Sequence, residues 1–194
     1  MKHSLSLVAF AAAIVLAAPA QAQVTTFQGS FAAEAIGATG SGTLDMVYDP
    51  VAHTLNISAT WAGLSGNTSN AHIHCCTALP NTGTASVALA EGGLLPGFPL
   101  GVKAGSYTRL IDLTQANQYN AGFVTGSGGT AAGAEARLIS NLSSGNAYFN
   151  IHTTTFGGGE IRAFVTAVPE PETYALMLAG LGLVGWAAKR RQSA

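Results

Sequence analysis

The chain has 194 residues, a formal net charge of −1 at pH 7 and 9% charged residues. Glycine is abundant, with 24 residues, and 48% of the chain is apolar. Because nucleic-acid binding needs clustered Lys and Arg, this composition argues against a nucleic-acid partner.

The first 22 residues have the pattern of a secretory signal peptide. Lys2 and His3 precede an apolar run, residues 5–18, and the small residues at 20–22 read Ala-Gln-Ala. We expect an N-terminal signal helix that signal peptidase removes after Ala22. A first transmembrane helix or a buried core helix is the alternative, and the Ala-x-Ala ending followed by polar residues argues against it.

Residues 23–167 are long enough for one domain with its own core. They carry four Lys or Arg and seven Asp or Glu, a net charge near −3, so Ser, Thr, Asn and Gly must supply the solubility. Period-two alternation with β-branched and aromatic residues predicts seven strands. These strands are 24–31, 43–48, 53–61, 71–75, 106–113, 147–153 and 160–166.

Turns and one helix connect the predicted strands. A turn at 49–52 joins the second and third strands as a hairpin, glycines 157–159 separate the last two, and 91–101 is expected to be a surface loop. Ala and Leu at helical spacing predict one helix at 131–142. The fold class is therefore all-β: an antiparallel, Greek-key-like β-sandwich with one short crossover helix.

The sequence AHIHCC, residues 71–76, is the most informative internal stretch. In a strand, His72, His74 and Cys76 project from one face, opposite the core-facing residues between them. In AYFNIHT, residues 147–153, His152 also lies on the side away from the core. Three imidazoles on one face can bind a single copper or zinc ion.

A structural role is the alternative for these histidines. They would then fix strand ends through hydrogen bonds, with His152 bonded to a backbone carbonyl. Glu160 is expected to be an exposed strand carboxylate paired with Arg162 or Arg109, although it could instead orient one imidazole.

Cys75 and Cys76 are the only cysteines, and export places them in an oxidising compartment. Three states stay open: a vicinal disulfide, a disulfide between molecules, or thiolates that join His72 and His74 in a soft Cu(I) or Zn site. A vicinal disulfide requires a strained ring. We favour it because two free neighbouring thiols outside the cell would oxidise readily.

Three stretches resemble the CHRD domain, which is named after chordin and occurs in many exported bacterial proteins. They are AHIH at 71–74, AYFNIHT at 147–153 and GGEIRA at 158–163. The resemblance spans most of the mature chain and departs at Cys75 and Cys76, where many members have Gly-Pro or similar residues. It implies an extracellular module without established catalysis.

The histidine pattern is also locally similar to Cu,Zn superoxide dismutase, an exported β-sandwich with His-x-His on a strand. A dinuclear site of that kind needs about six histidines and an aspartate. Residues 23–167 contain only His53, His72, His74 and His152. The dinuclear enzyme is therefore excluded, whereas one copper or zinc ion on three imidazoles stays open. We recognise no Gly-x-Ser-x-Gly elbow, acid–base pair or phosphate loop, so we assign no catalytic residues.

Residues 168–194 form a separate C-terminal segment. The extended motif Val168-Pro169-Glu170-Pro171 precedes an apolar helix at 174–188 and the basic end Lys189, Arg190 and Arg191. At ~1.5 Å per residue the helix is roughly 22 Å long against a hydrocarbon core of about 30 Å, and the basic end would stay on the cytoplasmic side. The segment closely resembles the PEP-CTERM sorting signal, which implies a transient transmembrane helix that an exosortase removes.

These features predict an exported CHRD-domain protein that is sorted to the cell surface or extracellular matrix. There it would act as a non-enzymatic binding or structural module, with exopolysaccharide or matrix proteins as partners. The alternative is a mononuclear copper- or zinc-binding exported protein that uses His72, His74 and His152.

Overall fold

The computed structural model describes residues 23–169 and 171–192. The predicted signal helix with its cleavage site at Ala22 and the sorting-motif residue Glu170 lie outside these residues.

Within the described residues, the alternating segments form nine strands. The strands are β1 Thr25–Ala33, β2 Ser41–Asp49, β3 Thr54–Ala62, β4 Thr68–Cys75, β5 Val87–Leu89, β6 Gly105–Asp112, β7 Ala147–Thr153, β8 Ile161–Phe164 and β9 Thr166–Val168. The helices are the 3₁₀ helix η1 Ala116–Gln118 and the α-helices α1 Ala121–Gly126, α2 Ala131–Ser143 and α3 Pro171–Gln192. Each of the seven predicted strand segments contains a strand, and the segment 160–166 contains parts of two.

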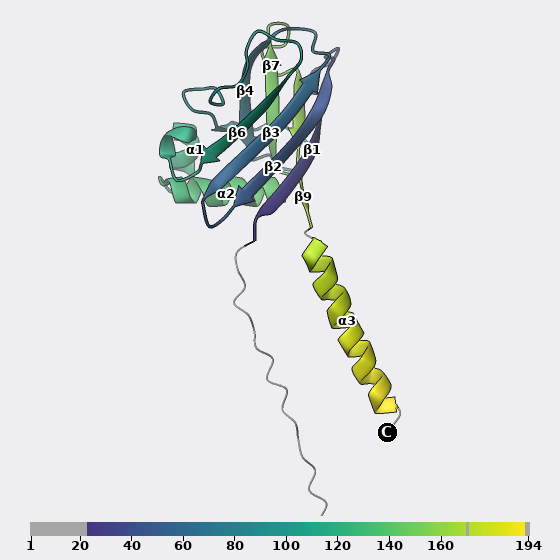
Figure 1. Ribbon diagram of the computed structural model, residues 1–194. Coiled ribbons are helices and arrows are strands. Elements are labelled where there is room, and N and C mark those ends of the chain that lie inside the picture. The colour runs from purple at the N-terminus through teal and green to yellow at the C-terminus, as the bar shows by residue number, and fades with distance from the viewer. Residues whose placement is uncertain (1–22, 170, 193–194) are drawn as a thin grey trace, which may run out of the picture.

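The strands are hydrogen-bonded in the order β5-β4-β7-β8-β1-β2-β3-β6, with β9 also paired to β1, and all pairs are antiparallel. Strand β1 belongs to two layers, because most of it pairs with β2 while Ala32 and Ala33 pair with β8. Figure 1 shows β1, β2, β3 and β6 lying in front of β4 and β7. The connections from β3 to β4 and from β6 to β7 cross between the layers, so the predicted Greek-key-like β-sandwich is confirmed.

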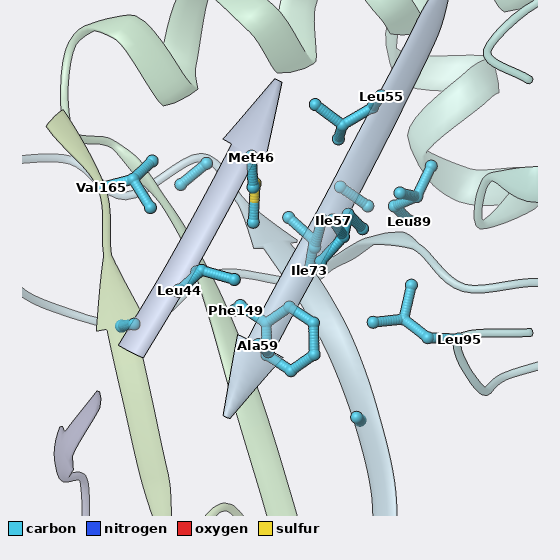
Figure 2. Close-up of a cluster of buried hydrophobic side chains, with 14 of the residues drawn as sticks. Leu44, Met46, Leu55, Ile57, Ala59, Ile73, Leu89, Leu95, Phe149 and Val165 are labelled. Carbon is cyan, nitrogen blue, oxygen red and sulfur yellow. The ribbon is translucent and has the colours of Figure 1, made fainter. Parts of the chain in front are cut away.

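The core lies between these two layers. Strands β2 and β3 direct alternate side chains inward, where they face side chains such as Ile73 of β4 and Phe149 of β7 (Figure 2). The rings of Phe31 and Phe149 meet edge to face at a centroid distance of 5.5 Å, which joins the layers directly. Each such side chain contributes roughly 1.5–3 kcal/mol on full burial, so the sandwich is stabilised mainly by this interior.

Helix α2 confirms the predicted crossover helix. It begins after Thr130, whose side chain accepts a hydrogen bond from the Gly133 amide, and it buries Ala134, Leu138 and Leu142 on one side. Helix α1 was not predicted, because six residues with two glycines have little helical propensity. Its formation depends on tertiary contacts.

Two further features differ from the sequence prediction. The loop 91–101 is not confined to the surface, since Leu95 and Phe98 enter the core. The segment 160–166 changes partners at the buried Val165, so that β8 pairs with β7 while β9 pairs with β1. In both cases an apolar side chain gains burial by breaking the local pattern.

The domain ends beside its beginning, because Val168 in β9 is the pairing partner of Thr26 in β1. Helix α3 follows, and Lys189, Arg190 and Arg191 occupy its last turn. The predicted transmembrane segment 174–188 thus lies in a helix, but no helix in the described part of the chain is both long and apolar enough to cross a membrane.

Candidate metal centre

Three histidines come together on the outer side of the β4–β7 pair. In β4 the residues Ala71, Ile73 and Cys75 are buried in the core, so the alternation of the strand sends His72 and His74 to the other side. Cross-strand register places Asn70 opposite His152 on β7. His72, His74 and His152 are called the histidine cluster below.

The imidazoles of the histidine cluster are close enough to share one ion. One ring nitrogen from each residue lies within 4.8 Å of the others. The closest approach is 3.0 Å, between His72 Nδ1 and His152 Nε2. His72 is only 8% exposed, so this site is mostly shielded from solvent.

Each imidazole also contacts a backbone carbonyl through its other nitrogen. His72 Nε2 lies 2.7 Å from Gly93 O, His74 Nδ1 lies 2.8 Å from Ala85 O, and His152 Nδ1 lies 2.9 Å from Gly157 O. A carbonyl oxygen can only accept, so these nitrogens donate. In metalloproteins a ligating histidine is oriented in this way, by donating its second N–H to a carbonyl or carboxylate.

Burial keeps two of the imidazoles neutral near pH 7. It lowers the pKa of His72 to about 4, with the Gly93 carbonyl opposing this shift and the neighbouring imidazoles adding to it. Burial also lowers the pKa of His74, against contacts with the Ala85 carbonyl and the Asn150 side chain. The neutral imidazole is the form that binds a metal ion.

Asn150 and Glu34 complete the surroundings of the histidine cluster, and sequence reasoning gave neither a role. Asn150 faces His72 across the strand pair and is 1% exposed. Its Nδ2 donates to Glu34 Oε2 at 3.2 Å, and Glu34 also lies 3.6 Å from the Arg162 guanidinium. The position of Asn150 two residues before His152 was a signal for the shared face, but its contact with Glu34 spans 116 residues and could not be read from spacing.

The cysteines do not join the histidine cluster. The Sγ atoms of Cys75 and Cys76 are bonded to each other in the structure. Both residues line a surface pocket of about 510 Å³, together with Phe123, Arg137 and Ala85, whose carbonyl accepts from His74. The redox state of the pair in the exported protein stays a prediction.

The expectation for Glu160 was wrong. Glu160 is 0% exposed, and its carboxylate accepts hydrogen bonds from the Ser65 amide and the Thr153 hydroxyl, both at 2.6 Å. Burial alone would raise the pKa of Glu160, but these hydrogen bonds outweigh burial and lower it. Because residues 65–66 fold over the end of β7, the carboxylate joins two loops and contacts neither predicted arginine. Arg162 pairs with Glu34 instead.

The described residues form an antiparallel β-sandwich, and a separate C-terminal helix follows it. A family model for the CHRD domain matches residues 20–165, so the chain belongs to the CHRD domain family. The PEP-CTERM protein-sorting motif matches residues 167–191. This motif implies processing by an exosortase, a C-terminal membrane anchor and export towards the cell surface. Searches among curated proteins and among solved structures found no match.

Proposed function

We propose that the mature domain acts as a non-enzymatic binding or structural module at the cell surface or in the extracellular matrix. The sorting motif supports this destination. Strand β9 ends the sandwich at Val168, so cleavage beyond this residue would leave the pairing of β9 with β1 intact.

The outer face of strands β1, β2, β3 and β6 has side chains suited to bind a polar, uncharged partner. Cross-strand register aligns two rows of side chains over these four strands. One row contains Gln28, Asp45, Ser58 and Thr108, and the other contains Ser30, Thr43, Thr60 and Ser106. Seven of these eight side chains are hydroxyls or amides, which both donate and accept hydrogen bonds as sugar hydroxyls do. This face is the observation that favours an exopolysaccharide partner over a charged protein.

Affinity electrophoresis of the processed protein in gels that contain the exopolysaccharide of the producing cells tests this proposal. We expect retardation of the wild type. The variant Ser58→Arg/Thr60→Arg, which places two bulky cations on the polar face, should migrate without retardation. Ala132→Arg/Ala136→Arg is the matched control, because both alanines are exposed on α2. Absence of wild-type retardation, or equal retardation of both variants, would overturn the polysaccharide partner.

A second candidate function is that of a mononuclear copper- or zinc-binding exported protein. The convergence of three ring nitrogens within 4.8 Å favours it. Metal analysis by mass spectrometry on protein purified without a polyhistidine tag should find one ion per chain, and His72→Ala/His74→Ala should lose it. Folded wild type that contains no metal and resists reconstitution would exclude this candidate.

A further inference from the structure

Three contacts in the histidine cluster each need a hydrogen atom, and two uncharged imidazoles carry only two. His72 and His152 form a chain between two carbonyls, with contacts of 2.7 Å to Gly93 O, 3.0 Å between the rings and 2.9 Å to Gly157 O. Each of these three contacts needs one hydrogen atom, but two neutral imidazoles supply only two and carbonyls supply none. Any assignment of tautomers therefore leaves two lone pairs facing each other.

A second pair of acceptor atoms lies in the same place. His74 donates through Nδ1 to Ala85 O, so its Nε2 carries a lone pair. Asn150 must direct its Nδ2 at Glu34, because a carboxylate only accepts, and its Oδ1 is then left to face the other way. Within residues 23–169 and 171–192, His74 Nε2 and Asn150 Oδ1 are buried and have no hydrogen-bond partner.

Both places lack hydrogen-bond donors and have acceptor atoms left over. Four acceptor atoms gather on one face of β4 and β7: two ring nitrogens lie 3.0 Å apart, and the other two atoms are buried without a partner among the described residues. Leaving such an atom unsatisfied is destabilising, because nothing compensates for its loss of hydration. A single cation would satisfy all four at once, whereas apolar packing or one water molecule would not.

We propose that the histidine cluster and Asn150 form a four-ligand site for one borderline first-row metal ion, Zn²⁺ or copper, bound by His72 Nδ1, His74 Nε2, His152 Nε2 and Asn150 Oδ1. This proposal rests on the second candidate function and adds the fourth ligand and the choice of nitrogen on each ring. Imidazole donors suit zinc and copper, while Ca²⁺ and Mg²⁺ require oxygen ligands.

The distances between the three ring nitrogens fit a tetrahedral ion after a small adjustment. Zinc lies about 2.0–2.1 Å from imidazole nitrogen, which puts tetrahedral ligand atoms about 3.4 Å apart. The ring nitrogens of the cluster span from 3.0 Å to at most 4.8 Å. The closest pair has to separate slightly and the widest has to contract, movements that fall within the reach of side-chain rotation.

The surroundings hold the ligands in place. Carbonyls from three separate loops orient the rings, and Glu34 orients Asn150. Gly159 has a φ of +124°, and a β-carbon there would collide with the Glu34 carboxylate and the Asn150 amide. The glycine therefore permits Glu34 to reach Asn150, and the negative carboxylate behind the ligand offsets part of the charge of the ion.

Competition between the full chain and a chromophoric chelator, with Zn²⁺ and with Cu⁺ as the probes, tests the proposal. We expect one ion per wild-type chain and an affinity at least about 10-fold weaker for Asn150→Ala, because one of the four ligands is lost. Asn146→Ala is the matched control: Asn146 precedes β7 and bonds to Thr77, outside the cluster, so its removal should leave the affinity unchanged.

Nuclear magnetic resonance of isotope-labelled wild type keeps the test independent of the folding of the variant. Zn²⁺ should shift the Asn150 side-chain ¹³Cγ signal together with His72 ¹⁵Nδ1 and the ¹⁵Nε2 signals of His74 and His152. If the wild type binds neither ion, the second candidate function and this proposal both fall. If it binds an ion while Asn150→Ala binds equally well, or while the Asn150 signal does not move, only the fourth ligand is wrong.

Discussion

Two groups of polar side chains show how differently the hydrogen-bonding contacts of histidines can be satisfied in this fold. Near the first hairpin, His53 Nδ1 lies 3.0 Å from both carboxylate oxygens of Glu135, and the Tyr48 hydroxyl donates to the same carboxylate at 2.7 Å. Glu135 is 5% exposed, and the His53 side chain is 51% exposed. These three residues, called the hairpin network, pair donors with an acceptor and connect the β2–β3 hairpin to α2.

The histidine cluster has the opposite composition. Its rings donate to backbone carbonyls and Asn150 donates to Glu34. The remaining ring nitrogens and Asn150 Oδ1 are then acceptors without a protein donor in the described part of the chain. The comparison teaches that the balance of protons, and not the number of histidines, separates a structural site from a ligand site. The protein itself satisfies the contacts of the hairpin network, whereas the proposed metal ion would satisfy those of the histidine cluster.

The largest expected effect comes from removing one imidazole of the cluster. His152→Ala should weaken Zn²⁺ binding at least about 100-fold, or roughly 2.8 kcal/mol, because a nitrogen that binds the ion directly is lost. His53→Ala should leave Zn²⁺ binding unchanged, since the hairpin network already uses that imidazole. Chelator competition measures both affinities, and an equal loss in the two variants would show that the comparison is wrong.

A smaller effect is expected from opening the hairpin network. Glu135→Ala removes the acceptor of Tyr48 and His53 and should reduce the free energy of unfolding by about 2–3 kcal/mol, the range for hydrogen bonds to a charged group. Glu91→Ala is the control, because Glu91 bonds to Asn117 and Gln118 at the surface and should cost less than about 0.5 kcal/mol. Urea unfolding gives both values, and similar values would contradict a structural role for the network.

The architecture was largely predictable because period-two alternation persists over most strands. Residues 54–62 alternate between buried and exposed without interruption, and 131–142 has helical spacing with clear stop residues. The strands β5 and β9 have three residues each, too few for a period to be recognised. Such short elements depend on what packs against them, which the local sequence does not contain.

The candidate site was predictable only in part, for the same reason. Strand parity placed the three histidines on one side of the sheet, because that follows from local geometry. The carbonyls that orient them belong to loops, and the burial of Glu160 depends on residues 65–66 folding over it. Contacts between distant loops follow from the whole fold, so neither the tautomers nor the role of Asn150 could be derived from spacing.

The smallest expected effect is the response of the hairpin network to alkaline pH. Burial, followed by the contact with Glu135, raises the pKa of Tyr48 to about 12 from the ordinary value of 10.0. The fold therefore favours the neutral phenol, and this stabilisation is complete below pH 10 and is lost as the pH rises from 10 towards 12. Residue 48 cannot ionise in Tyr48→Phe, so urea unfolding at pH 9 and pH 11 should show a larger loss of stability for the wild type than for the variant.

Burial also raises the pKa of Tyr107 to about 12, and it raises the pKa of Tyr119 by a larger amount. Both tyrosines can ionise in the wild type and in Tyr48→Phe. The contribution of Tyr107 cancels in the difference between wild type and Tyr48→Phe, and that of Tyr119 cancels except for its small coupling to Tyr48. An identical dependence on pH in the two proteins would mean that the Tyr48 hydroxyl is solvated and not held by Glu135. The hairpin network would then lose its donor, and the contrast with the histidine cluster would rest on His53 alone.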